Sequence, residues 1–143
     1  MAYHYKLETL LNVRRNIEEQ AQLKLAHELY VLENHKAYLV DLQAKRSEAL
    51  EDLSRYQQGT MAAAMYSFYV ENIERKDREI IFQYQAIAAQ EQAVAVVRAE
   101  LVARMKERQI VERLKEKDFK LYRQEELRKE QKESDEQAVL RFR

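Results

Sequence analysis

The chain has 143 residues, of which 35% are charged, and it contains one Gly and no Pro. Tight turns depend on Gly and Pro, so this composition excludes a sheet protein with frequent turns. Lys plus Arg and Asp plus Glu number 25 each, and this zero net charge argues against nucleic acid or anionic lipid as a partner.

The first half of the chain carries apolar residues at helical spacing. One series lies at multiples of seven and comprises Leu11, Leu25, Leu32, Leu39 and Leu53. A second series, offset by three, comprises Leu7, Ala21, Leu42, Ala49 and Tyr56. Such a stripe is typical of a coiled coil and predicts a helix over about residues 4–57. Several polar residues interrupt the stripe, and we expect them to fix the register of the paired helices. They are Arg14, Glu18, Glu28, His35 and Arg46.

The only glycine, Gly59, follows the polar stretch 54–58. A Gly after the last helical turn can adopt the left-handed conformation that ends a helix, and Thr60 can then cap the next helix. We therefore predict a turn near residues 58–60. The alternative is one unbroken helix that dimerises in parallel, because a mid-helix Gly costs only about 1 kcal/mol.

A second apolar series follows the turn, again at multiples of seven: Tyr66, Ile73, Ile80, Ile87, Val94 and Leu101. It predicts a helix over about residues 61–137. Antiparallel pairing is the simplest way for two long amphipathic helices with a short connection to bury both stripes. The predicted fold is all-α: residues 1–143 form a single antiparallel coiled-coil hairpin of two long helices, and the second is longer and overhangs.

The overhang is expected to begin where the start of the chain meets Arg104 to Arg108. Beyond that point the apolar series changes phase, passing to Ile110, Leu114 and Leu121. The stretch 115–136 is densely charged, with Glu–Lys pairs at the i,i+4 spacing that supports a helix without a core.

Catalysis and metal binding have little support in the sequence. A single Gly cannot build a phosphate-binding loop. The histidines His4, His27 and His35 lack a carboxylate constellation at zinc spacing, and with no Cys there are no thiolate ligands. We predict no enzyme, no cofactor and no metal. No apolar run is long enough for a membrane span, and the first residues do not read as a cleaved signal, so membrane insertion is not expected.

Two groups of residues are candidates for protein binding. The aromatic residues Tyr66, Phe68, Tyr69 and Tyr84 cannot all face one seam, so some should face outward as anchors; the alternative is packing over Leu53 and Tyr56. The basic pair Arg14–Arg15 and the residues Arg104, Lys106 and Arg108 should meet at the base of the hairpin. Together they could dock on an acidic surface, whereas each alone reads as a solvated face.

Both ends of the chain resemble a known family. Residues 5–15, Tyr-Lys-Leu-Glu-Thr-Leu-Leu-Asn-Val-Arg-Arg, resemble the opening of the flagellar FliJ protein family. Residues 130–138, Glu-Gln-Lys-Glu-Ser-Asp-Glu-Gln-Ala, resemble its closing acidic element. The resemblance implies a component of the flagellar type III export apparatus, similar in shape to the central stalk of rotary ATPases.

The resemblance also implies partners. The family's terminal helices engage the hexameric flagellar export ATPase, here through Leu7, Leu11, Arg14, Arg15, Arg108, Glu130, Asp135 and Glu136. Its hairpin part contacts the cytoplasmic domain of the export gate protein, here through Leu39, Leu42, Arg46, Tyr69 and Ile73. The family often has aromatic residues at the positions of Leu42 and Arg46, so the gate match is the weaker one.

Export chaperones are further implied partners, and the implied location is the cytoplasm, peripheral to the inner membrane at the flagellar base. We expect the free chain to be monomeric. A second hypothesis is a generic coiled-coil chaperone or scaffold that covers hydrophobic helices of client proteins. A catalytic role survives only if Arg14 or Arg15 completes a site in another subunit, as an arginine finger does.

Overall fold

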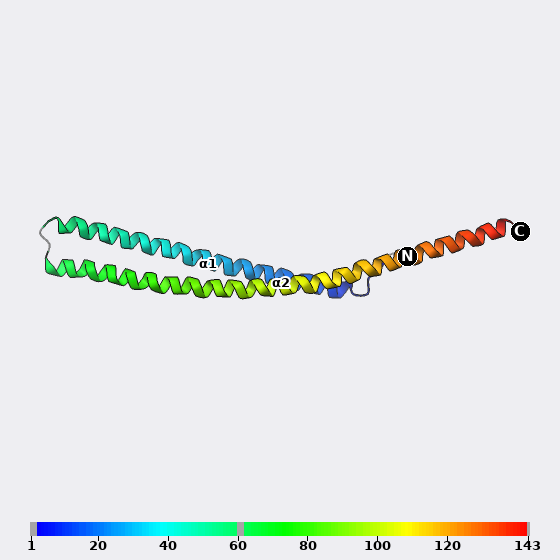
Figure 1. Cartoon of the computed structure of the whole chain (residues 1–143), viewed down its shortest axis with the longest axis horizontal. Helices are drawn as coiled ribbons and strands as arrows, with labels where there is room; N and C mark the ends of the chain where they lie inside the picture. Colours follow the sequence, from blue (N-terminus) through cyan, green and yellow to red (C-terminus); the bar gives the residue numbers. More distant parts are fainter. Residues whose placement is uncertain (1–2, 60–61, 143) are drawn as a thin grey trace. The chain divides into compact units, whose positions relative to one another are not determined.

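The computed structural model describes residues 3–59 and 62–142, which form two helices. Helix α1 spans Glu8–Gln57 and helix α2 spans Ala63–Arg141. The two lie side by side and run in opposite directions (Figure 1). The predicted all-α antiparallel hairpin with a longer second helix is confirmed. Thr60, expected to cap the second helix, lies outside the described residues.

The chain divides into two compact units, and each contains a stretch of both helices. The terminal unit comprises Met1–Gln22 and Glu100–Arg143, and the turn unit comprises Leu23–Ala99. Each unit has its own apolar cluster.

In the turn unit, the core follows the predicted heptads. Leu32, Ile87 and Val94 form its buried cluster, and partly buried leucines pack against them, namely Leu25, Leu29 and Leu39. Leu42 on α1 and Ile73 on α2 are also buried. Because these residues recur at seven-residue intervals, one face of each helix stays in contact along the unit.

In the terminal unit, the core is smaller and includes residues that precede α1. Tyr5, Leu11 and Val111 form the buried cluster, and Tyr3 packs against it. The hydroxyl of Tyr5 donates a 3.3 Å hydrogen bond to the backbone oxygen of Val111. Leu11 is fully buried, so it is the centre of this cluster.

The expected change of phase after Leu101 is wrong. Arg108, Lys115 and Tyr122 continue the earlier seven-residue series and are the less exposed residues, whereas Ile110, Leu114 and Leu121 are 58%, 47% and 60% exposed. The inward positions here are mostly polar and are held by ion pairs. In this part of α2, a prediction from apolar spacing therefore selects the exposed face instead of the face that contacts α1.

The expectation that α2 has no partner beyond Arg108 is also wrong. The Tyr3 ring lies 5.0 Å from the Phe119 ring and 5.2 Å from the Tyr122 ring, measured between centroids. Residues 3–7 precede α1, and backbone that is not helical can advance about 3.3 Å per residue, against about 1.5 Å in a helix. They therefore reach further along α2 than helical residues would.

Gly59 does not adopt the predicted left-handed conformation, since no described residue has a positive φ. Its N–H instead donates a 3.3 Å hydrogen bond to the backbone oxygen of Tyr56. This i→i+3 bond occupies a carbonyl at the end of α1 without a positive φ, so the turn does not require glycine at this position.

Candidate protein-binding surfaces

The polar residues that interrupt the α1 stripe in the turn unit have polar partners on α2. The Gln83 side-chain amide donates to the backbone oxygen of His35 at 2.8 Å, and the Gln90 amide donates to the backbone oxygen of Glu28 at 3.0 Å. Arg46 forms an ion pair with Asp77. Because each polar group at the seam must meet its partner, these pairs favour one register of the two helices.

The terminal unit joins its helices by charged pairs. Arg14 Nη1 lies 2.8 Å from Glu107 Oε2, and Arg15 Nη2 lies 3.5 Å from Glu112 Oε1. Further pairs join Glu18 to Arg108, and Glu8 to Lys115 at 2.8 Å. The hydrogen bond from Lys115 lowers the pKa of Glu8, which keeps that carboxylate charged.

The four arginines of the predicted basic group are therefore brought together but are not an open basic surface. The fifth member of the group, Lys106, is exposed. Arg14 and Arg104 share the carboxylate of Glu107, and Arg15 and Arg108 share that of Glu112. The hydrogen bond to Glu18 raises the pKa of Arg108. These cations are already paired, so attraction to a distant acidic surface would be weak.

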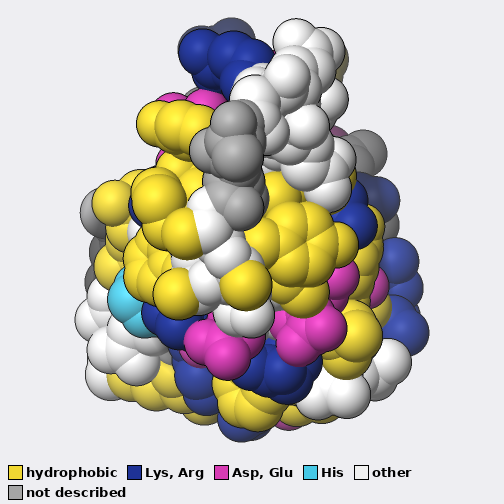
Figure 2. Space-filling model, turned by 90° about the vertical axis from the view of Figure 1, so that its left-hand side faces the viewer, with side chains coloured by type: hydrophobic (Ala, Val, Ile, Leu, Met, Phe, Trp, Pro, Cys, Tyr) yellow, Lys and Arg dark blue, Asp and Glu magenta, His cyan; other side chains and the backbone are white. Residues whose placement is uncertain are grey.

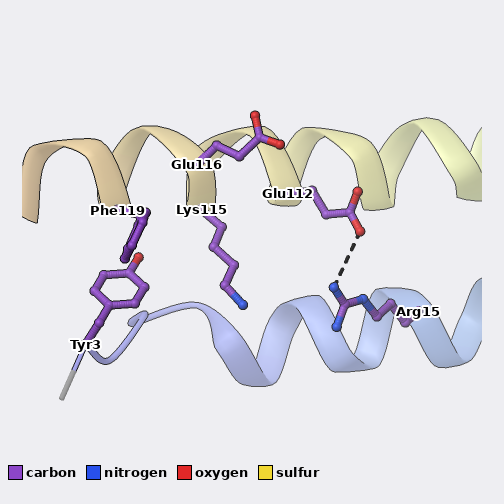
Figure 3. A pocket seen from close by; sticks show the side chains of 6 residues that line it. All are labelled: Tyr3, Arg15, Glu112, Lys115, Glu116 and Phe119. Carbon is purple, nitrogen blue, oxygen red and sulfur yellow. Dashed lines mark ion pairs between the residues drawn. The ribbon is translucent and has the colours of Figure 1, made fainter. Parts of the chain in front are cut away.

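A cavity of about 520 Å³ opens beside these pairs (Figure 3). Tyr3 and Phe119 lie at one end of it and the Arg15–Glu112 ion pair lies at the other. Lys115 and Glu116 complete the lining. The cavity thus offers an aromatic surface together with charges of both signs, which suits a protein side chain or peptide.

Tyr3 anchors the residues that precede α1. Its hydroxyl donates a 2.8 Å hydrogen bond to Asp118 Oδ2. Burial and this hydrogen bond to a carboxylate raise the pKa of Tyr3 to about 12, because both disfavour the phenolate. Since Tyr3 is the donor, the contact persists only while the phenol is protonated.

The residues that the resemblance assigned to the ATPase all lie in the terminal unit. The side chain of Leu11 is fully buried, and Arg14 and Arg108 are occupied in ion pairs. The accessible members are Leu7, Arg15, Glu130, Asp135 and Glu136. A partner at this end would therefore meet the surface of the last third of α2 more directly than the buried residues of α1.

That last third also carries apolar residues that sequence reasoning did not assign. Val139 and Leu140 lie on one exposed face of α2 together with Lys132, Asp135 and Glu136. Every described residue from Leu127 to Phe142 is exposed. The signal was present in the sequence as a Val-Leu pair directly after the acidic element, but attention to the charges alone missed it.

The residues assigned to the gate all lie in the turn unit. Leu42 and Ile73 are buried between the helices, and Arg46 is held by Asp77. Leu39 is half-buried against the core cluster. Tyr69 is half-buried as well. Most of this set therefore packs between the two helices and contributes little to the outer surface of the unit.

Hydrophobic side chains gather on the end of the turn unit (Figure 2). The exposed large apolar residues closest in sequence to the turn are Tyr56, Met65, Tyr66 and Phe68. The Tyr69 ring lies 5.3 Å from that of Tyr56 and 5.9 Å from that of Phe68. The aromatic group therefore shows both arrangements that the sequence allowed: Tyr69 packs over Tyr56, while Tyr66 and Phe68 are exposed. Tyr84 is exposed as well, but its hydroxyl accepts a 3.1 Å hydrogen bond from Gln43 of α1.

A family model described as the flagellar FliJ protein matches residues 3–143. The chain belongs to the flagellar FliJ protein family. It is thereby a coiled-coil component of type III export, and the resemblance seen at its two ends extends over nearly its whole length.

A solved structure, that of a YscO homologue from Chlamydia trachomatis, resembles this FliJ-family chain with a TM-score of 0.75. The two are 20% identical, and the match covers 97% of this chain and 94% of the other. At this identity the likeness supports the fold alone. A comparison with curated proteins gave no match.

Among the described residues of the FliJ-family chain, no helix is both long and apolar enough to cross a membrane. Among the same residues, no group of three or more His, Asp or Glu side chains is placed to hold a metal ion.

Proposed function

We propose that this FliJ-family chain is a non-catalytic adaptor that binds the hexameric export ATPase through its terminal unit and the cytoplasmic domain of the export gate protein through its turn unit. Binding promotes assembly or turnover of the ATPase and couples it to the gate. Export chaperones are additional partners. The adaptor acts in the cytoplasm, peripheral to the inner membrane at the flagellar base.

The exposed end of α2 is the observation that carries this proposal. Beyond Tyr122 the helix has no described contact with α1, yet it presents acidic and apolar residues together, at Asp135, Glu136, Val139 and Leu140. A helix without tertiary packing is marginal in water, so such a surface is best explained by a partner that covers it.

The two units separate the two proposed contacts. All residues assigned to the ATPase belong to one unit and all those assigned to the gate belong to the other. A stiff helical pair with an asymmetric charged end can enter a ring of subunits and favour one subunit state over the others. Only differential binding of this kind shifts the equilibrium of the ring.

The test measures the turnover and the oligomeric state of the purified ATPase at low salt, with and without the chain. We expect stimulation by the full chain and at least tenfold weaker binding after truncation from Glu130 onward or after the double substitution Asp135→Lys, Glu136→Lys. The matched control is Glu33→Lys, an exposed acidic residue of the turn unit. An ATPase indifferent to the added chain would overturn the proposal.

The gate contact has its own variants. Phe68→Ala with Tyr66→Ala removes two exposed rings near the turn and should weaken binding of the gate domain while leaving ATPase stimulation intact. Tyr30→Ala, an exposed aromatic residue of α1, is the control. If the unmodified chain, the double variant and Tyr30→Ala bind the gate domain equally well, the exposed rings near the turn do not contact the gate.

The exposed aromatic residues near the turn also favour a second candidate, a general chaperone or scaffold for client helices. Under this function, truncation from Glu130 onward should leave suppression of client aggregation largely intact, whereas Phe68→Ala should reduce it. Loss of ATPase binding without loss of client protection, in the same truncated protein, would separate the two functions.

A further inference from the structure

The middle of α2 is nearly free of charge. Residues 80–97 contain one charged side chain, Glu91, in a chain that is 35% charged. The inward side of this stretch is accounted for by the core of the turn unit, where Ile87 and Val94 are buried. The apolar character of its opposite side is not explained by the hairpin.

That opposite side forms an outer strip made of residues at seven-residue intervals. The outer strip comprises Ile81, Phe82, Gln85, Ala88, Ala89, Gln92, Ala95 and Val96. All eight are exposed, and the large members Ile81, Phe82 and Val96 are 60%, 73% and 68% exposed. A heptad repeat on the solvent side of a paired helix is the pattern of a second helix-packing seam.

The outer strip is approximately symmetric about its centre. A two-fold axis between Ala88 and Ala89 relates Ile81 to Val96, Phe82 to Ala95 and Gln85 to Gln92. Across the axis the bulky Phe82 thus meets the small Ala95, the two glutamines meet each other and the two central alanines meet each other. Such self-complementarity is what an isologous contact between two identical surfaces requires.

We propose that the outer strip is a self-association surface on which two copies of this chain pack antiparallel through α2, centred on Ala88 and Ala89. The small side chains at the centre let the two backbones approach closely, while Phe82 of each copy packs over Ala95 of the other. The glutamines at positions 85 and 92 can bond to each other as amide donor and acceptor.

The association disturbs no buried contact of the hairpin, because all eight residues of the outer strip are exposed. It is small compared with an obligate interface, so it should appear as a concentration-dependent monomer–dimer equilibrium, compatible with a monomer in dilute solution. It does not depend on the ATPase or on the gate.

Disulfide formation gives the decisive test, because the chain has no native Cys. Ala88→Cys should cross-link to itself under mild oxidation, since both copies of the residue lie beside the axis. Ile81→Cys alone should not, because its two copies lie about 22 Å apart at 1.5 Å per residue. A mixture of Ile81→Cys and Val96→Cys should yield the mixed dimer.

Sedimentation of the full chain provides an independent measurement. Phe82→Glu should weaken dimerisation at least tenfold, whereas Leu127→Glu, a change at another exposed apolar residue, in the terminal unit, should leave it unchanged. Helical content is expected to stay the same, since both side chains are exposed. A monomer at every concentration, self-cross-linking of Ile81→Cys as strong as that of Ala88→Cys, or equal loss of dimer in both Glu variants overturns the proposal.

Discussion

Glu18 on α1 accepts hydrogen bonds from two nitrogens of Arg108 on α2, from Nε and, at 3.3 Å, from Nη2. Arg108 also donates through Nη1 to Glu112 Oε2 at 2.7 Å. Glu18 is the only charged residue among the buried ones described. The guanidinium therefore joins the two helices at a layer where an apolar coiled coil would have two leucines.

Removing one residue of the Glu18–Arg108 pair should destabilise the terminal unit more than swapping the two residues. Glu18→Ala leaves Arg108 without its main acceptor and should lower the melting temperature by roughly 5 °C. The exchanged double variant Glu18→Arg, Arg108→Glu should recover at least half of that loss. Thermal melts followed by circular dichroism measure both, with Glu19→Ala as the exposed control. Equal melting of Glu18→Ala and Glu19→Ala would contradict a structural role for the pair.

Leu11 is the centre of the apolar cluster of the terminal unit and is 0% exposed. Leu11→Ala should therefore cost about 3 kcal/mol of unfolding free energy, as deletion of a buried side chain typically does. Val13→Ala, two residues away but 48% exposed, should cost less than about 1 kcal/mol. Urea denaturation provides the comparison, and similar costs for the two variants would place Leu11 outside the core.

The packing of residues 3–7 against α2 should be lost at alkaline pH. The pKa of Tyr3 is raised to about 12 from an ordinary value of 10, so docking favours the protonated phenol. Its contribution to stability is complete below pH 10 and is lost as the pH rises from 10 to about 12. The absorbance difference between the native chain and Tyr3→Phe, followed through a pH titration, isolates this one tyrosine.

Asp118→Asn is the matched variant for that titration. The amide keeps an acceptor for the Tyr3 hydroxyl but removes the negative charge, so the pKa of Tyr3 should move back toward 10. An unchanged titration midpoint would show that burial alone sets the pKa and that the hydrogen bond at 2.8 Å contributes nothing.

Gly59→Ala should be tolerated. The position has no positive φ, and a Cβ atom there would meet only the backbone oxygen of Tyr56, at 4.0 Å. Because Ala restricts the unfolded chain more than Gly does, we expect a stabilisation of about 0.5 kcal/mol. A loss of more than about 1 kcal/mol in urea denaturation would indicate that the turn needs the conformational freedom of glycine after all.

Heptad spacing predicted the seam of the turn unit well because the apolar side chains that produce the sequence pattern are also the ones that pack between the helices. Leu32 and Ile87 were placed correctly for this reason. In the terminal unit the positions that continue the seven-residue series are Arg108 and Lys115, and hydrophobic periodicity gives no signal for charged inward positions. The sequence prediction therefore followed Ile110 and Leu114 onto an exposed face.

By itself the sequence determined that this protein is helical, that it folds back near Gly59 and that its two ends match the FliJ family. These properties are local or periodic: they follow from the near absence of turn residues and from side chains a few positions apart. Only the tertiary structure decided which groups face one another, such as Glu18 with Arg108 and Tyr3 with Asp118. Those pairings join residues about a hundred positions apart, and their register depends on how the two helices fit together, which no spacing along one helix encodes.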